Sequence, residues 1–192
     1  MSNGTPAVSR RRLFAQNFFK HPRMLGSLVP SSRFLVDQLL RQIDWPNART
    51  IVEYGPGVGT FTGEILKRMR PDARLIVLEM NPSFVAYLRS HLDDDRLVVA
   101  HSSAGAVQQV LADHQLQSAD YIISGIPFST IPPDERQAIL KATHESLATG
   151  GEFLVYQFSS KVLPHLKVQF GYVRTDFEPL NILPARLFYC SP

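Results

Sequence analysis

The sequence contains a single cysteine, Cys190, so an intrachain disulfide is excluded. One free thiol is typical of proteins that work in a reducing cytosol. Charged residues make up 19% of the chain and hydrophobic residues 44%, which excludes wholesale disorder and favours a globular fold. A chain of 192 residues fits one domain with a short extension, and its core needs no covalent support.

Long apolar runs are also missing from the sequence. No stretch approaches the roughly 20 apolar residues that a membrane-spanning helix needs. The basic residues near the N-terminus are not followed by the apolar segment of about 7–15 residues that marks a signal peptide. We therefore expect neither a membrane span nor a leader, and a cytoplasmic protein.

The net charge of +3 is small, but it is unevenly distributed. Residues 1–41 carry seven basic residues and one acid, whereas the remainder is acidic overall. Residues 10–20 are expected to form a short amphipathic helix in which arginine and lysine flank Leu13, Phe14 and Phe18. This pattern predicts an anionic partner surface, and a merely solubilising N-terminus is the alternative.

Strand and helix patterns alternate along most of the chain. A helix over 32–43, with Phe34, Leu35, Leu39 and Ile43 inward, precedes them. Strands are expected over 50–54, 74–79, 97–100, 121–124 and 152–158, and helices over 59–69, 82–91, 104–113 and 133–148. This alternation predicts right-handed βαβ units and a parallel sheet, which strands over 172–177 and 185–189 close as an antiparallel hairpin.

A glycine loop follows the first of these strands. Gly55, Gly57 and Gly59 allow a tight turn and a close backbone approach to a ligand at the start of a helix. Glu53 lies just before the loop, where it would repel the pyrophosphate of a dinucleotide, and Thr60 stands where the third glycine of that motif belongs. A cationic ammonium and sulfonium favour such a carboxylate, so the loop favours S-adenosylmethionine (SAM) over NAD.

A second carboxylate ends the next strand. Glu79 follows Leu75 to Leu78, at the position where an acid can accept both hydroxyls of a ribose. A single acid at a strand end is often only a solvated surface residue. An acid before the loop, three spaced glycines and an acid after the next strand together favour a nucleoside cofactor, bound without metal.

This combination resembles the class I SAM-dependent methyltransferases over roughly residues 45–158. The resemblance implies an α/β, Rossmann-like domain with a mostly parallel seven-stranded sheet and an antiparallel C-terminal hairpin. It also implies that Tyr54, Met80, Ser103 and Ser124 lie in the cofactor site. The family often has an aspartate after the third strand that contacts adenine; here Ser102-Ser103-Ala104 stands there. We therefore expect the Ser103 hydroxyl, backbone groups and packing to hold the adenine.

The acceptor site of this family lies after the fourth strand, at Ser124-Gly125-Ile126-Pro127-Phe128. Adenine N6-methyltransferases carry an asparagine or aspartate there, which accepts from the amino group of the flipped base, followed by a proline and an aromatic residue that stacks on it. This chain keeps the proline and the aromatic residue. Gly125 replaces the recognising side chain, which counts against a nucleic-acid acceptor.

Several further segments resemble the bacterial phospholipid N-methyltransferases, a family related in fold to the rRNA adenine dimethylases. They include Phe18-Phe19-Lys20, residues 26–32 and Asn181-Ile182-Leu183-Pro184-Ala185-Arg186. The resemblance implies methylation of the phosphatidylethanolamine amine at the inner membrane face, with residues 1–44 as a basic extension and lid and 45–192 as the SAM-binding domain. The stretch Ser159-Ser160-Lys161-Val162 departs from that family. We expect a monomer that binds an anionic membrane surface and a phospholipid substrate.

The catalytic groups are less clearly marked. Phe128 and Tyr156 are the side chains we expect to face the acceptor amine, and Tyr156, His101 and water are candidates for its base. Three other functions stay open: an RNA adenine methyltransferase, a small-molecule methyltransferase with the N-terminal helix as a lid, and a SAM-binding regulator without catalysis.

Overall fold

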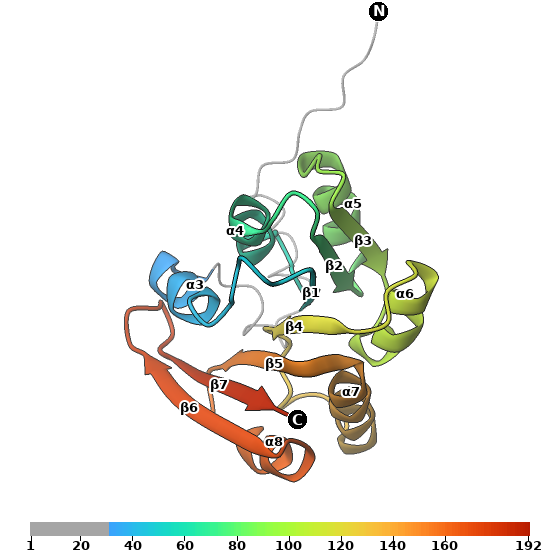
Figure 1. Ribbon diagram of the computed structural model, residues 1–192. Coiled ribbons are helices and arrows are strands. Elements are labelled where there is room, and N and C mark those ends of the chain that lie inside the picture. The colour runs from blue at the N-terminus through green and yellow to red at the C-terminus, as the bar shows by residue number, and fades with distance from the viewer. Residues whose placement is uncertain (1–30) are drawn as a thin grey trace, which may run out of the picture.

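The computed structural model describes residues 31–192, and the predicted helix at 10–20 lies outside them. The described residues form a seven-stranded sheet in the order β3-β2-β1-β4-β5-β7-β6, with helices on both faces (Figure 1). The strands are β1 (Thr50–Tyr54), β2 (Arg74–Glu79), β3 (Leu97–His101), β4 (Ala119–Ser124), β5 (Leu147–Gln157), β6 (Tyr172–Glu178) and β7 (Ala185–Ser191). The helices are α3 (Arg33–Leu40), α4 (Thr60–Arg68), α5 (Pro82–His91), α6 (Val107–Asp113), α7 (Pro133–Ser146) and α8 (Leu163–Gln169), and a 3₁₀ turn (Ala104–Ala106) leads into α6.

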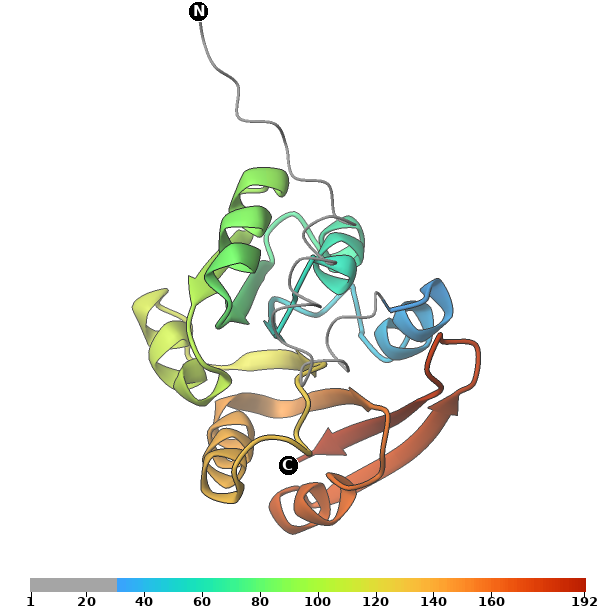
Figure 2. The same ribbon diagram turned by 180° about the vertical axis from the view of Figure 1, so that it is seen from behind.

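The strands β1 to β5 run parallel, and β7 pairs antiparallel with both β5 and β6. The two C-terminal strands stand at one edge of the sheet, as the view from behind shows (Figure 2). The predicted parallel sheet with an antiparallel C-terminal hairpin is therefore confirmed. Among residues 31–192, no helix is long and apolar enough to cross a membrane.

Two apolar clusters fill the space between the sheet and its helices. One packs side chains of α3, α4 and α5 against one face, and the other packs those of α6, α7 and α8 against the opposite face. Strand β1 runs between them with every residue buried, as is usual for central parallel strands. Its side chains alternate, so Ile51 joins the first cluster and Val52 and Tyr54 the second.

The helix α3 belongs to the core of the domain. Ser32 caps its start, because the Ser32 hydroxyl accepts from the Leu35 N–H at 3.2 Å. Leu35 and Leu39 are fully buried in the cluster that also contains β1 and α4. A boundary at residues 44/45 therefore does not separate α3 from the domain. Phe34, predicted inward, is instead 46% exposed, because Val36 and Leu40 complete the buried face.

Two further elements differ from the prediction. The helix α8 was not predicted; it has only seven residues, and Leu166 is its buried side chain. Helix α7 ends at Ser146 and β5 already begins at Leu147, earlier than the strand predicted from residue 152, and the start of β5 pairs irregularly with β4. Backbone oxygens within about 3 Å of the Gly151 Cβ position leave no room for a side chain there.

Candidate functional site: a cofactor cavity and an acceptor cavity

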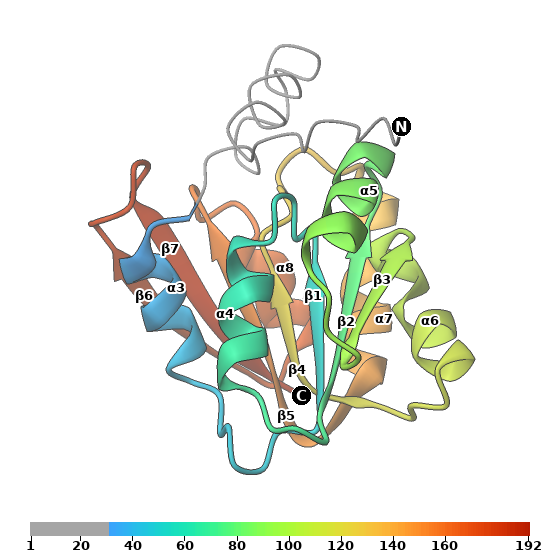
Figure 3. The ribbon, with the colours of Figure 1, turned by 90° about the horizontal axis from the view of Figure 1, so that it is seen from above.

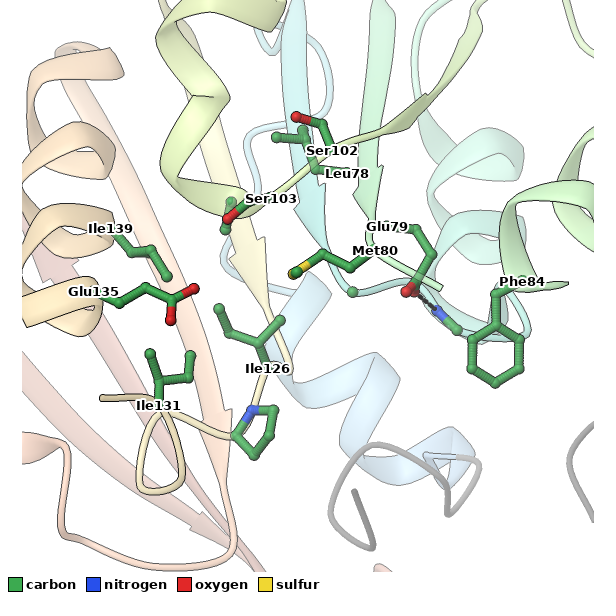
Figure 4. Close-up of a pocket in the computed structure, with 14 residues that line it drawn as sticks. Leu78, Glu79, Met80, Phe84, Ser102, Ser103, Ile126, Ile131, Glu135 and Ile139 are labelled. Atoms are coloured by element: carbon green, nitrogen blue, oxygen red, sulfur yellow. Dashed lines mark hydrogen bonds between the residues drawn. The ribbon is translucent and has the colours of Figure 1, made fainter. Parts of the chain in front are cut away.

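A cavity opens at the carboxyl ends of β1, β2, β3 and β4, where parallel sheets of this kind bind ligands (Figure 4). Its volume is about 740 Å³ including the open mouth, which suffices for a molecule the size of a nucleoside. It is lined by Gly55, Gly57, Leu78, Glu79, Met80, Phe84, Ser102, Ser103, Ala104, Ile126, Pro127, Ile131, Glu135 and Ile139.

The loop after β1 forms one wall of this cavity. Gly55, Gly57 and Gly59 have φ angles of 65°, 56° and 75°, a region that favours glycine. A Cβ on Gly55 would also lie 2.8 Å from Cγ2 of Ile126. The Gly55 N–H donates to the carbonyl of Leu78 at 2.9 Å, which ties the loop to the end of β2. The backbone therefore approaches the cavity as the glycine pattern predicts.

Glu79 lies where the ribose acid was expected. Its Oε2 accepts from the Gly57 N–H at 3.1 Å and its Oε1 from the Asn81 N–H at 2.8 Å. Burial raises the pKa of Glu79, and the backbone N–H groups oppose that rise because they stabilise the carboxylate. The side chain lines the cavity at the end of β2, where the Gly57 N–H of the loop holds its carboxylate (Figure 4).

Glu53 occupies a different place from the one predicted. It points from β1 toward α4, is almost fully buried and accepts from the Thr62 hydroxyl at 2.7 Å. It lies behind the loop and does not line the cavity. Burial raises the pKa of Glu53 to about 8, and the charge of Glu79 adds to the rise. The predicted carboxylate is therefore protonated in the free protein at neutral pH, and a cation at the loop would favour its ionisation.

Apolar side chains form the rest of the cavity. Met80, predicted in the cofactor site, is largely exposed at its edge, and Ser103 lines it while its hydroxyl accepts from the Gly105 N–H at 3.3 Å. Phe84 on α5 and Glu135 in the first turn of α7 also line the cavity, and neither was predicted from the sequence. Figure 4 shows the Glu135 carboxylate across the cavity from Glu79, beside Ile131 and Ile139. These apolar side chains, with a carboxylate on either side, suit a flat nucleobase that carries polar groups on its edge.

Three predicted site residues lie away from this cavity. The Tyr54 ring is fully buried, and its hydroxyl lies 3.1 Å from that of Thr143. Ser124 is fully buried in β4, and no described residue bonds its hydroxyl. Phe128 is also fully buried, with its ring edge-on to Phe153 at 6.3 Å. Its N–H donates to the Ile126 carbonyl, and this tight turn directs the ring into the core. Phe128 is therefore not a wall of an acceptor site, which corrects that prediction.

A second cavity adjoins the first and shares Pro127 with it. Its volume is about 610 Å³ including the mouth, and it is lined by Gly125, Pro127, Ser129, Thr130, Tyr156, Gln157, Phe158 and Ser159. The Gln157 side chain donates to the Ile126 carbonyl at 2.8 Å and so fixes the loop after β4 to the end of β5. This cavity stands where an acceptor would have to lie, next to the cofactor cavity.

Tyr156 defines the inner wall of the acceptor cavity. Its ring stacks on Phe61 with centroids 5.1 Å apart, and a Cβ on Gly125 would overlap the phenol oxygen. The phenol thus occupies the space that a side chain at residue 125 would take. Burial raises the pKa of Tyr156 to about 12; the Ser31 hydroxyl opposes this rise and the charge of Glu53 adds to it. The phenol is therefore protonated at neutral pH.

His101, a candidate base, does not line the acceptor cavity. Its Nε2 lies 3.0 Å from the carbonyl oxygen of Met80, so the ring braces the segment after β2. The structure therefore associates His101 with the cofactor side of the site.

Comparisons with known proteins agree with this geometry. Residues 51–151 match the family described as "Methyltransferase domain". An ornithine lipid N-methyltransferase of Singulisphaera acidiphila is 33% identical over 180 residues, covering 93% of this chain and 94% of that protein. A solved methyltransferase from Geobacter sulfurreducens superposes with a TM-score of 0.64 at 12% identity, covering 99% and 92% of the two chains. Human Methyltransferase-like protein 13, solved in complex with SAH, gives a TM-score of 0.60 at 17% identity, covering 90% and 81%.

The fold, the glycine loop and the acid at the end of β2 define a class I SAM-dependent methyltransferase. The family match and the 33% identity show that this chain belongs to these enzymes, and that it is similar to a bacterial lipid N-methyltransferase. Its cofactor is SAM, which supplies an electrophilic methyl group on a sulfonium. The cavity is large enough for the adenosine part, and Glu79 and mostly apolar side chains line it.

Proposed function

We propose that this enzyme methylates the amine of a membrane-lipid head group, with phosphatidylethanolamine-type lipids as the acceptor. Two observations support an amine acceptor on a lipid. The similar protein of Singulisphaera acidiphila acts on ornithine lipid, whose head group also carries a primary amine. The acceptor cavity has Tyr156 and Phe158 among its walls, as a pocket for an amine that becomes a permanent cation requires.

The observation that carries the proposal is the packing of Tyr156 against Gly125. A nucleobase methyltransferase would need an asparagine or aspartate at residue 125 to recognise the amino group of the base. Here the phenol fills that space, so either side chain would require the Tyr156 ring to move. The acceptor is therefore met by a protonated phenol and an aromatic face rather than by a carboxamide.

The chain's own groups position the acceptor for an in-line attack. The oxygen of Tyr156 accepts an N–H of the amine and orients its lone pair, and the stacked Phe61 ring holds the phenol in place. An alkyl ammonium with a pKa of about 10.4 must lose a proton before it attacks. The phenol is itself protonated and His101 lies outside the cavity, so the proton leaves to water at the open mouth.

The N-terminal segment supplies the membrane contact in this proposal. Arg10, Arg11, Arg12, Lys20 and Arg23 lie close together in the sequence with Leu13, Phe14 and Phe18 among them. Each base near an anionic surface contributes about 1 kcal/mol, and the apolar side chains enter the head-group boundary. The enzyme then acts as a peripheral monomer on the inner membrane face, and deletion of residues 1–23 abolishes its stimulation by anionic vesicles.

The test is an acceptor panel with tritiated SAM. Vesicles of phosphatidylethanolamine with and without anionic lipid, vesicles of ornithine lipid, structured RNA and soluble amines are offered separately. We expect label in phosphatidylethanolamine, with a rate that rises when anionic lipid is added. Label in ornithine lipid alone would move the proposal to that head group. Label in RNA, or in soluble amines without any response to vesicles, would overturn it.

A substitution of Tyr156 tests the role of the phenol. Tyr156→Phe keeps the ring but removes the oxygen, so we expect kcat to fall about tenfold, the scale of one hydrogen bond made in the transition state, with SAM affinity unchanged. Tyr172→Phe, in an exposed position on β6, is the matched control and should not change kcat. An undiminished kcat in Tyr156→Phe would remove the phenol from the reaction.

A further inference from the structure

The loop between β6 and β7 presents a cluster of exposed apolar side chains. Ile182 is 72% and Leu180 61% exposed, and Leu183 and Phe177 are about half exposed. Scattered apolar residues are ordinary on a protein surface, but four of them within seven residues form a patch. This apolar tip, residues 177–183, contains part of the Asn181 to Arg186 segment that has no role in the site described above.

Two polar side chains bond to the backbone of the apolar tip. The Glu178 side chain accepts from the Leu180 N–H at 2.6 Å, and the Asn181 side chain donates to the Leu183 carbonyl at 2.9 Å. Both polar side chains are buried, and Pro179 and Pro184 have no N–H to satisfy. A segment that enters a medium of low polarity needs such internal bonds.

The apolar tip stands beside the mouth of the acceptor cavity. Gln157 at the end of β5 pairs with Arg186, so the loop extends beyond that end, where Phe158 and Ser159 line the cavity. Figure 3 shows the loop and the carboxyl end of β5 at the same side of the sheet. The Asn181 side chain also accepts from the Ser32 N–H at 2.8 Å, which attaches the loop to the start of α3.

Basic side chains flank the apolar tip. The Arg186 guanidinium lies 5.9 Å from the centre of the Phe177 ring, and Arg33 lies 5.5 Å from that of the exposed Phe34. The nearby acid Asp176 accepts from the Gln38 side chain at 2.9 Å. Apolar side chains with arginines beside them suit the boundary of a bilayer, where acyl chains meet anionic head groups.

We propose that the apolar tip, with Arg33 and Arg186, is a second membrane contact that inserts into an anionic bilayer and holds the acceptor cavity against the lipid. The role of this contact in catalysis rests on the proposed lipid function. Membrane binding by the tip can nevertheless be measured without methyl transfer. It differs from the N-terminal contact because it belongs to the folded domain and lies next to the cavity.

The first experiment compares two variants of the full chain. Ile182→Ser/Leu183→Ser removes apolar area from the tip, whereas Val168→Ser removes an 88% exposed side chain from α8, away from the tip. In cosedimentation with phosphatidylethanolamine and phosphatidylglycerol vesicles, we expect the tip variant to bind about tenfold or more weaker. The control should bind like the wild type, and both should keep SAM affinity. Equal vesicle binding by the two variants would overturn the proposal.

A second measurement reports insertion directly. The chain has one tryptophan, Trp45, so Trp45→Phe/Leu183→Trp places the only indole in the tip. We expect vesicles with brominated acyl chains to quench its fluorescence, and vesicles of neutral lipid to quench it less. An indole that stays unquenched, because the tip is covered by residues 1–30 or remains in water, would overturn the proposal.

The two proposals fail differently. Tip-dependent vesicle binding without any lipid methylation would refute the lipid acceptor and keep the membrane contact. Lipid methylation at the wild-type rate by the tip variant would refute the contact and keep the lipid acceptor.

Discussion

The cofactor cavity and the acceptor cavity share a wall but are built in different ways. The cofactor side takes its glycine loop and its first acid from the carboxyl ends of β1 and β2, where the Gly57 N–H donates to Glu79. The acceptor side depends on Gly125 and Tyr156, which follow the paired residues Ser124 and Val155 of the neighbouring strands β4 and β5. The glycine loop and the contact between Gly125 and Tyr156 involve different residues, so substitutions can alter the two cavities separately.

The largest effect is expected on the cofactor side, from Gly55→Ala. The new Cβ would be strained at a φ of 65° and would lie 2.8 Å from Ile126, so the loop must shift. We expect SAM affinity to fall by about 100-fold or more, measured by calorimetry. Gly63→Ala on α4 meets nothing within 4 Å and is the matched control. Tight SAM binding by Gly55→Ala would show that the loop does not form the site.

Removal of the ribose acid should have the next effect. Glu79→Ala leaves the cofactor hydroxyls unpaired, and we expect a loss of about 1.5–3 kcal/mol in SAM binding, the scale of charge-assisted hydrogen bonds. Glu64→Ala, an acid on α4 outside the cavity, controls for net charge. Undiminished calorimetric affinity in Glu79→Ala would remove this residue from the ribose role.

Glu53 should make the stability of the free protein depend on pH. Its pKa is raised to about 8, so the folded state favours the protonated form. This contribution is fully present below the unfolded pKa and is lost as pH rises through the folded value, so stability should fall by about 2 kcal/mol between pH 6 and 7.5. Glu53→Gln should flatten that fall in thermal melts. If stability falls equally with pH in the wild type and in Glu53→Gln, a group other than Glu53 causes the fall.

The smallest effect concerns Glu135, which lines the cofactor cavity from α7. We expect its carboxylate to accept from the adenine amino group, so that Glu135→Gln weakens SAM binding by about three- to tenfold. Asp134→Asn changes the neighbouring charge outside the cavity and serves as the control. A 6-oxo analogue of the cofactor should not distinguish Glu135→Gln from the wild type, and if it does, the contact is not to the amino group.

Local pattern predicted much of this molecule. The bounds of β1 and β2, the sheet with its antiparallel hairpin, and the position of Glu79 follow from alternation, turns and strand ends. The direction in which individual side chains point could not be predicted from the same local patterns. Every residue of β1 is buried, so polar and apolar residues do not alternate along this strand. The sequence of β1 therefore does not indicate on which side of the sheet the Tyr54 ring lies.

The acceptor side was harder to predict for a related reason. Phe128 lies one residue after Pro127, a cavity residue, yet a tight turn sends its ring into the core. Glu135 lies at the start of α7, and the packing of this helix against the 3₁₀ turn after β3 brings the residue to the cofactor cavity. Neither contact has a signature in a short window of sequence, because each depends on how distant elements pack.

The most direct test of the account is Gly125→Ala, measured for SAM affinity and for methyl transfer to lipid vesicles on the same preparation. Its Cβ would overlap the Tyr156 phenol, and both residues line the acceptor cavity but not the cofactor cavity. We expect SAM affinity within about threefold of the wild type, which also shows that the variant is folded, and methyl transfer reduced by about 100-fold or more. Methyl transfer at the wild-type rate would contradict the assignment of this cavity to the acceptor.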